Sequence, residues 1–131
     1  MIFEYALSTQ QEYFYNITQQ VSEAVNKCGI MSGIATVFCP HTTAGVTINE
    51  NADPDLVHDL LVGLGKAFPD RQEFRHGEGN SAAHLKASAM GSSATVIIEN
   101  GKLLLGTWQG IYFTEFDPPR NRKFYVKIIG E

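Results

Sequence analysis

The stretch at positions 94–106, ATVIIENGKLLLG, carries the strongest signal for the fold. Two runs rich in aliphatic residues, 94–99 and 102–106, flank the pair Asn100-Gly101. An Asn-Gly pair between two such runs is typical of a two-residue β-hairpin turn, because both residues tolerate positive φ. The sequence therefore predicts two antiparallel strands joined by a tight turn.

The C-terminal third contains a second pair of strand-like runs. TWQGIYFTEFD at 107–117 and RKFYVKII at 122–129 flank PPRN, which predicts a second hairpin with a longer turn. Further strands are expected at 2–8, 33–39 and 45–49. Because strands outnumber helices and most neighbours are joined by hairpins, we expect an α+β fold. It should be an antiparallel β-sandwich or jelly-roll-like barrel with two to three helices packed on it, in a single domain over 1–131.

A first helix is predicted between the strands at 2–8 and 33–39. Thr9 with Glu12 three residues later has the spacing of a capping box. Gly29 is expected to end this helix. The helix would then present one apolar face to a sheet, at helical spacing, made by Phe14, Ile17, Val21, Ala24 and Cys28.

Two more helices have clear start signals. Asp53 is expected to cap the second helix, with Pro54 at its first position. Asn80 or Ser81 is expected to begin a short third helix that stops at Gly91. The segment between these helices is polar and predicts a loop.

The amino-acid composition limits which binding partners and which cellular compartment are expected. The chain has 131 residues, 44% of them hydrophobic and 18% charged, so it can bury a core. A net charge of -4 argues against nonspecific nucleic-acid binding, which depends on an excess of Lys and Arg. Two cysteines are too few for a disulfide framework. With no signal peptide and no apolar run of the ~20 residues that span a bilayer, we expect a cytoplasmic protein without a membrane partner.

Three histidines stand in segments rich in polar residues. His41 begins HTTAGVTINENADPD, and His76 and His84 bracket HGEGNSAAH. Three neutral imidazoles that converge can bind a divalent metal and leave a position open for water or substrate. Alternatively, His41 closes a turn and the other two are surface groups. His58 lies beside the apolar stripe of the second helix and is the poorest candidate.

The glycine-rich entry to the third helix is a candidate anion site. Backbone N–H groups of such a turn can point at one place, and the helix N-terminus adds partial positive charge. The alternative is an ordinary entry from loop to helix.

Other polar residues are candidates with competing structural roles. Glu50 is a candidate partner for a histidine or a general base, as are Asp53 and Glu78, although capping is the favoured role for Asp53. Trp108 could stack on a ligand ring or pack in the sheet, and Gln109, framed by two glycines, is a candidate amide facing the ligand. Arg120 and Arg122 are suited to phosphate, and they equally fit a solvated turn.

Three segments resemble the YjbQ-like family, the secondary thiamine-phosphate synthase family. They are HTTAGVTINENADPD, FRHGEGNSAAHLKASAMGSS and GKLLLGTWQGIYFTEFDPPRNRK, which span most of residues 36–123 in the family's order. The resemblance implies a compact α+β domain and a homotrimer with clefts between subunits. It also implies weak thiamine-phosphate synthase activity, which joins a pyrimidine pyrophosphate to a thiazole phosphate and releases pyrophosphate.

Resemblance and residue chemistry together predict a site for a small phosphorylated metabolite. The expected catalytic residues are Glu50, His41 and Asn80. A divalent metal, Zn²⁺ or Mg²⁺, is expected at His41, His76 and His84. The expected contacts to substrate or phosphate come from Thr42, Thr43, Asn49, Gly79, Ser81, Lys86, Gln109 and Arg120. A non-catalytic binding protein and a metal-dependent hydrolase are the alternatives.

Overall fold

The computed structural model describes residues 1–131 and contains eight strands and three helices. In chain order the elements are β1 (Ile2–Thr9), β2 (Tyr13–Asn16), α1 (Thr18–Cys28), β3 (Ser32–Phe38), β4 (Ala44–Glu50), α2 (Pro54–Ala67), α3 (Ser81–Met90), β5 (Ser93–Glu99), β6 (Lys102–Leu103), β7 (Gln109–Glu115) and β8 (Arg120–Gly130). Every strand pair is antiparallel. The α+β class with an antiparallel β-framework is confirmed.

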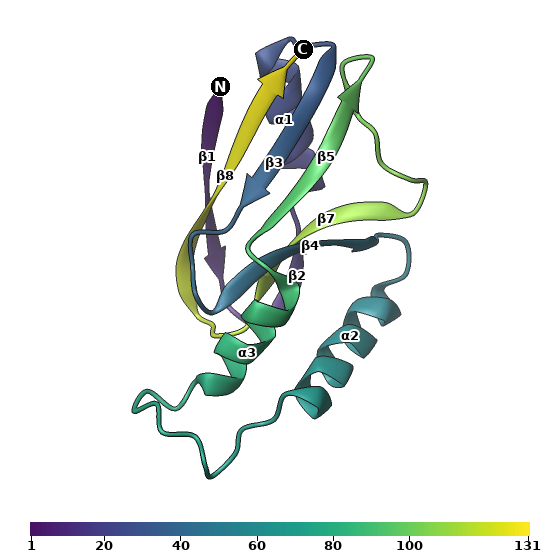
Figure 1. Cartoon of the computed structure of the whole chain (residues 1–131). Helices are drawn as coiled ribbons and strands as arrows, with labels where there is room; N and C mark the ends of the chain where they lie inside the picture. Colours follow the sequence, from purple (N-terminus) through teal and green to yellow (C-terminus); the bar gives the residue numbers. More distant parts are fainter.

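The strands form two sheets that pack face to face. One is five-stranded, in the order β1-β8-β3-β5-β6, and the other is three-stranded, in the order β2-β7-β4. In Figure 1, α1 lies behind the larger sheet, while α2 and α3 lie below the paired strands β4 and β7. The main core lies between the sheets and α1, and it includes Val21, Val37, Val46, Ile98, Phe113, Phe124 and Val126.

A smaller core lies on the other face of the three-stranded sheet. Phe14 and Tyr112 from this sheet contact Val57 of α2 and Ala87 of α3. The three-stranded sheet is therefore covered on both faces, and its second cover is the pair of helices that flank the polar loop. This arrangement brings α3 beside the start of β4.

The tight hairpin is confirmed. Asn100 and Gly101 both have positive φ, 54° and 73°, and Ile98 pairs with Leu103 across the turn. Only the first two residues of the expected strand at 102–106 remain paired, because the chain then turns away toward β7.

The predicted start of the first helix is wrong. Thr9 ends β1 and is fully buried, and Tyr13–Asn16 forms a strand paired with β7. The helix begins only at Thr18 and ends, as expected, at Gly29 with φ 69°. A capping-box spacing is a local signal, and here the aromatic residues before the helix pair with a strand instead.

The second predicted hairpin is also wrong. β7 belongs to the three-stranded sheet and β8 to the five-stranded sheet, where it pairs with β1 and β3. The turn between them therefore carries the chain from one sheet to the other. β8 alternates buried and exposed residues, whereas β7 is buried from Gly110 to Glu115, and neither pattern identifies the partner strand.

The other helix signals behave largely as expected. The Asp53 carboxylate accepts a hydrogen bond from the Asp55 N–H at 2.9 Å, and Pro54 is the first residue of α2. Gly91 follows the last residue of α3. Asn80 precedes α3, but its side chain caps nothing and is used elsewhere.

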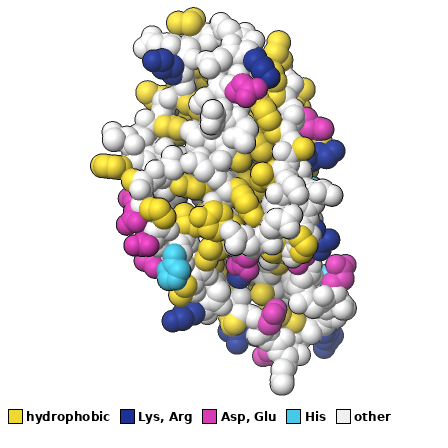
Figure 2. Space-filling view, turned by 180° about the vertical axis from the view of Figure 1, so that it is seen from behind, with side chains coloured by type: hydrophobic (Ala, Val, Ile, Leu, Met, Phe, Trp, Pro, Cys, Tyr) yellow, Lys and Arg dark blue, Asp and Glu magenta, His cyan; other side chains and the backbone are white.

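The surface seen from behind carries separate charged side chains of both signs around a broken band of hydrophobic ones (Figure 2). No continuous basic area covers this face, in keeping with the net charge of -4. None of the three helices combines the length and hydrophobicity required of a membrane-spanning segment.

Gly45 sets the approach of α3 to β4, and replacing it tests that contact. A Cβ at Gly45 would lie 2.6 Å from the Gly91 carbonyl oxygen and 3.0 Å from the Met90 Cβ. Gly45→Ala is therefore expected to lower the free energy of unfolding by about 1–3 kcal/mol, measured by urea denaturation. The control is Gly63→Ala on exposed α2, where nothing lies within 4 Å. This change should stabilise by about 0.5–1 kcal/mol through helix propensity, and equal effects of the two changes would contradict the packing argument.

Candidate functional site

A polar hollow that we call the histidine cleft lies where α3 meets the starts of β4 and β8. It has a volume of about 420 Å³, and none of its lining residues is hydrophobic. It is lined by His41, Thr42, Thr43, His76, Glu78, Asn80, His84, Asp117, Arg120, Asn121 and Arg122. Seven of the predicted site residues lie in this cleft: His41, Thr42, Thr43, His76, Asn80, His84 and Arg120.

Three segments far apart in the chain form the cleft. The loop before β4 carries His41 to Thr43, and the glycine-rich loop and first turn of α3 carry His76 to His84. The β7–β8 connection carries Asp117, and the first three residues of β8 are Arg120 to Arg122. A second hollow of about 500 Å³ adjoins it and shares His41, Thr42 and His84. The three histidines of the two polar segments therefore line one hollow.

The histidine rings have different surroundings. The rings of His76 and His84 meet edge to face with centroids 5.2 Å apart, and His76 Nε2 lies 3.8 Å from a Glu78 carboxylate oxygen. His41 Nε2 accepts a hydrogen bond from the Lys123 backbone N–H at 3.0 Å. Burial, and then the nearby Arg122 guanidinium, lower the pKa of His41 below its usual value. His41 is therefore neutral at pH 7 and held by backbone.

In the observed side-chain arrangement, the three histidines do not converge closely enough to form a metal centre. Nowhere in the chain are three His, Cys, Asp or Glu side chains gathered closely enough to hold a metal ion. The Nε2 atom of His41 is occupied by the backbone of β8. The divalent metal at His41, His76 and His84 stays a prediction, and the side-chain arrangement of this chain does not support it.

Arg120 lies at the rim of the cleft and is paired. Its Nη2 donates to the Asp117 carboxylate at 2.8 Å, and its Nε donates to the Asp117 backbone carbonyl. The same carboxylate accepts a hydrogen bond from Asn80 Nδ2 at 2.8 Å. Burial alone would raise the pKa of Asp117, but the hydrogen bonds from Asn80 and Arg120 outweigh it and lower the pKa. Asp117 therefore stays ionised and orients both neighbours.

Arg122 lies at the floor of the cleft and forms a buried ion pair with Glu115. Their side chains are 6% and 0% exposed. The Arg122 Nε and Nη2 donate to the two Glu115 carboxylate oxygens, and Nη2 also donates to Thr43 Oγ1 at 2.8 Å. Thr9 Oγ1 donates to Glu115 at 2.7 Å. The pair ties the ends of β1, β7 and β8 to the loop that carries His41.

Three predicted residues lie at the opposite end of the three-stranded sheet. Asn49 and Glu50 end β4, and Gln109 begins β7 beside them, paired with Glu50. The start and end of β4 lie ~20 Å apart, given a rise of about 3.4 Å per residue. The Gln109 side-chain Oε1 accepts a hydrogen bond from the Gly106 N–H at 2.8 Å. A single copy of the chain does not bring these residues to the histidines.

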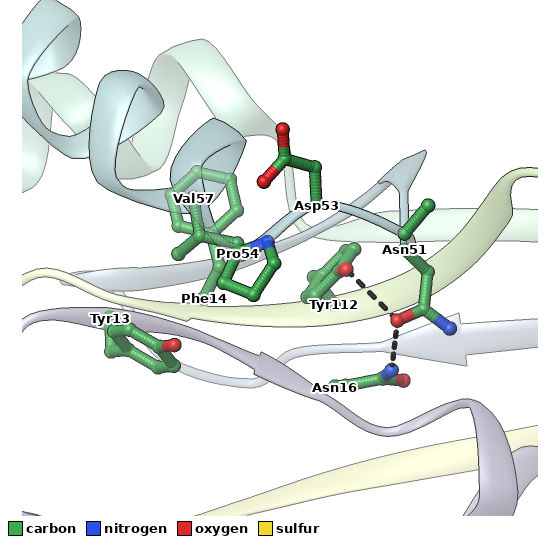
Figure 3. A pocket seen from close by; sticks show the side chains of 9 residues that line it. Tyr13, Phe14, Asn16, Asn51, Asp53, Pro54, Val57 and Tyr112 are labelled. Carbon is green, nitrogen blue, oxygen red and sulfur yellow. Dashed lines mark hydrogen bonds between the residues drawn. The ribbon is translucent and has the colours of Figure 1, made fainter.

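A separate hollow of about 210 Å³ lies at that end (Figure 3). Tyr13, Phe14, Pro54, Val57 and Tyr112 supply its apolar walls. Its polar groups are already bonded: the Asn51 side-chain Oδ1 accepts hydrogen bonds from Asn16 Nδ2 at 2.8 Å and from the Tyr112 hydroxyl at 3.4 Å. The Tyr112 hydroxyl also donates to the Glu50 backbone carbonyl at 2.9 Å. With its polar groups occupied in this way, it is a weaker candidate than the histidine cleft.

The remaining predicted phosphate contacts do not line the histidine cleft. Lys86 is buried on another side of α3, where its Nζ lies 2.9 Å from Glu12 and 5.9 Å from the centre of the Phe116 ring. Gly79 has φ 72° and donates its N–H to the His76 carbonyl, which shapes the loop. Ser81 is the first residue of α3. Their roles in phosphate binding stay predictions.

The cleft contains residues that the sequence reading did not place in a site. Asp117 and Asn121 line it, and Glu115 anchors Arg122 beneath it. A signal for the pair was present in the sequence. Arg122 precedes Phe124, Val126 and Ile128 at alternate positions of β8, and Glu115 follows Ile111 and Phe113 in the same way. A charge on a core-facing position needs a partner of opposite charge.

Comparisons with known proteins agree on one family. The family profile described as "UPF0047 protein YjbQ-like" matches residues 3–131. A UPF0047 protein of Methanocaldococcus jannaschii is 52% identical over 132 residues, covering 100% of this chain and 96% of that protein. The UPF0047 protein YugU of Bacillus subtilis is 52% identical over 124 residues, covering 94% of each.

Two solved structures have the same fold. The crystal structure of a conserved YjbQ/UPF0047 protein from Clostridium acetobutylicum is 62% identical with a TM-score of 0.95, covering 97% of this chain and 99% of that one. A YbjQ-like protein of unknown function from Sulfolobus solfataricus is 33% identical, also with a TM-score of 0.95, covering 100% and 97%. The matches cover essentially the whole chain, and the protein therefore belongs to the YjbQ-like UPF0047 family.

Proposed function

We propose that the histidine cleft binds a small phosphorylated metabolite and that the protein is a small-molecule transferase with weak thiamine-phosphate synthase activity. The observation that carries the proposal is the composition of the cleft. Two arginines and three imidazoles meet in one hollow without a single hydrophobic residue. Guanidinium and imidazole groups are common ligands for phosphoryl oxygens.

The proposed reaction needs little covalent chemistry from the protein. The thiazole nitrogen attacks the carbon that carries pyrophosphate, the carbon–oxygen bond breaks, and pyrophosphate leaves with that electron pair. Donors fixed at the leaving group stabilise its growing charge. Arg120 and Arg122 lie suitably in the cleft for this, and positioning of the two substrates supplies the rest.

The charge balance of the cleft bears on the role of a metal. Arg120 faces Asp117 and Arg122 faces Glu115, so each guanidinium already has a carboxylate. Glu78 adds a further negative charge. The two guanidinium charges are therefore already matched by carboxylates and leave no surplus of positive charge for a polyanion. The proposal therefore includes a divalent metal, Zn²⁺ or Mg²⁺, that would bind together with the pyrophosphate group of the substrate. The assay contains this metal.

Two alternatives remain as second proposals. A non-catalytic protein that binds a phosphorylated metabolite uses the same cleft and requires no turnover. A metal-dependent hydrolase with Glu50 as general base is supported less, because Glu50 lies at the far end of β4. Saturable thermal stabilisation by phosphorylated ligands without product would favour the binding protein.

The test of the transferase is release of pyrophosphate from the two thiamine precursors in the presence of Mg²⁺. His41→Ala and His84→Ala are each expected to lower kcat/KM by about 10–100-fold, since each removes a positioned polar group from the reacting site. The matched control is His58→Ala on α2, because the His58 side chain is 73% exposed, bonds only Asp59 and lies outside the cleft.

Three results would end the proposal. They are no pyrophosphate release by the wild-type protein, rates unchanged in both cleft variants, or an equal loss in His58→Ala. The variants are checked for folding by circular dichroism, so that a loss of rate is attributed to the cleft.

The proposal includes a homotrimer in the cytoplasm, and one surface supports association. Ile129, Ile34 and Ile97 pair in register across β8, β3 and β5 and are 55%, 38% and 53% exposed. Their sequence neighbours Ala35, Ile98 and Ile128 belong to the core, so alternation along the strands places the three isoleucines on the opposite face of the five-stranded sheet. Adjacent exposed aliphatic residues of this kind favour contact with another protein surface. Sedimentation of the wild-type protein and of Ile34→Lys checks the assembly.

A further inference from the structure

The guanidinium of Arg122 is held in one orientation by the protein. Three of its contacts are fixed: Nε and Nη2 to Glu115, and Nη2 to Thr43 Oγ1. The partners themselves are held, since Glu115 also accepts from Thr9 Oγ1 and from the Asp117 N–H at 2.9 Å. The side chain is 6% exposed. It therefore has little freedom to swing out of the cleft.

The third nitrogen of this guanidinium is unused. Arg122 Nη1 donates to no atom of the protein, although every other nitrogen of the group does. Three side-chain atoms of the protein are fully buried without a hydrogen-bond partner, and Arg122 Nη1 is not one of them, so this unbonded atom keeps some exposure to solvent. Since Arg122 lines the histidine cleft, the remaining N–H groups are accessible from there. The structure thus presents a fixed, charged donor at the bottom of a polar hollow.

Stability alone does not account for a buried ion pair at this position. Replacing a buried pair by apolar residues of similar size is often neutral or stabilising. The neighbours on the same faces, Phe113 and Phe124, show that apolar side chains pack at this junction. A buried guanidinium with spare donors facing a cleft is instead suited to hold an oxyanion.

Arg120 is arranged differently, although it is only two residues away. Its side chain is 48% exposed, and it is bonded to Asp117 at the rim. A rim arginine that is free to reorient loses more entropy on binding a ligand than one already held. The sequence alone gives no reason to distinguish the two arginines, but the structure shows that Arg122 is held in place before a ligand binds and Arg120 is not.

We propose that Arg122, through Nη1, binds a phosphoryl oxygen of the ligand at the floor of the histidine cleft and sets the specificity of the cleft for one terminal phosphate. This inference rests on the proposed function, which supplies the phosphorylated ligand. Because Glu115 balances the charge of Arg122, the floor accommodates a single phosphoryl group better than an extended polyanion lacking a bound cation. Arg120 contributes at the rim.

The experiment measures binding of inorganic phosphate to the wild-type protein and to variants by NMR titration at pH 7. The double variant Glu115→Leu with Arg122→Met removes both charges together and is expected to fold, which circular dichroism checks. It should bind phosphate at least about tenfold more weakly. Arg120→Met should weaken binding by less than about threefold. Lys123→Met removes an exposed charge next to Arg122 and should leave the affinity unchanged.

The Arg122 Nη1–H resonance gives a second readout that needs no variant. Its shift on addition of phosphate to the wild-type protein, with a smaller shift for Arg120, supports the inference. Unchanged phosphate affinity in the double variant, or a loss confined to Arg120→Met, overturns the inference and leaves the proposed function standing. Failure of the wild-type protein to bind phosphate at all overturns both.

Discussion

Glu115→Ala is expected to lower the free energy of unfolding by about 3–5 kcal/mol. The change leaves the Arg122 guanidinium buried without its counter-charge, and it removes the acceptor of the Thr9 hydroxyl. This loss is a large share of the roughly 5–15 kcal/mol of a typical domain. The measurement is urea denaturation followed by circular dichroism.

The double variant Glu115→Leu with Arg122→Met separates an unpaired charge from a lost contact. It removes both charges and retains volume, so it should recover most of the stability lost in Glu115→Ala. A double variant as unstable as the single one would contradict this account. It would mean that the pair itself, rather than its neutrality, holds the sheets together.

The ion pair also predicts how stability depends on pH. Burial alone would raise the pKa of Glu115, but hydrogen bonds from Arg122, Thr9 and the Asp117 N–H outweigh it and hold the pKa below its usual 4.5. The unfolded chain then binds the proton more tightly than the folded one, so stability is lost as the pH falls from about 4.5 through the lower folded value. Denaturation between pH 3 and pH 6, in roughly half-unit steps, should show a shallower loss in the double variant.

Phe113→Ala is expected to cost about 3–5 kcal/mol of unfolding free energy. Phe113 is fully buried at the junction of the sheets, and its ring lies 6.1 Å from that of Phe124 and 6.4 Å from that of His41, centre to centre. Truncation leaves a cavity directly beneath His41. Turnover or phosphate binding should therefore fall along with stability, since the support of the cleft is lost.

Trp108→Ala is the matched control for the aromatic truncation. Trp108 is larger and lies just before the same strand, but it is 63% exposed. Its removal should change stability by no more than about 0.5 kcal/mol. A comparable loss in both variants, measured by chemical denaturation, would show that Trp108 is covered by another copy of the chain.

Local signals in the sequence predicted many elements correctly. The Asn100-Gly101 hairpin, the Asp53 cap and the ends of two helices at Gly29 and Gly91 follow from conformational preferences of a few residues. The helix expected to begin at Thr9 does not form there, because Thr9 ends a strand and its buried hydroxyl donates a hydrogen bond to Glu115. That partner is 106 residues away in the chain, beyond the reach of a local pattern.

The candidate site was predicted in part, for a similar reason. His41, His76 and His84 come from two polar segments of the sequence and lie in one cleft, as was expected. Glu50 lies in the same sequence segment as His41, but the seven residues of β4 carry it away from His41. Gln109 lies beside Glu50 at that far end. Residues that are close in sequence become distant in space along a β-strand, because each residue lengthens the strand by about 3.4 Å.

The sequence by itself determined the family, the antiparallel β-rich class and the local turns and caps, because these depend on residues that are neighbours in the chain. Only the tertiary structure decided that β7 and β8 enter different sheets and that Arg120 and Arg122 have different roles. Alternation places both arginines on the same side of β8. Which of them is buried depends on the segments that cover that side, and these come from distant parts of the chain.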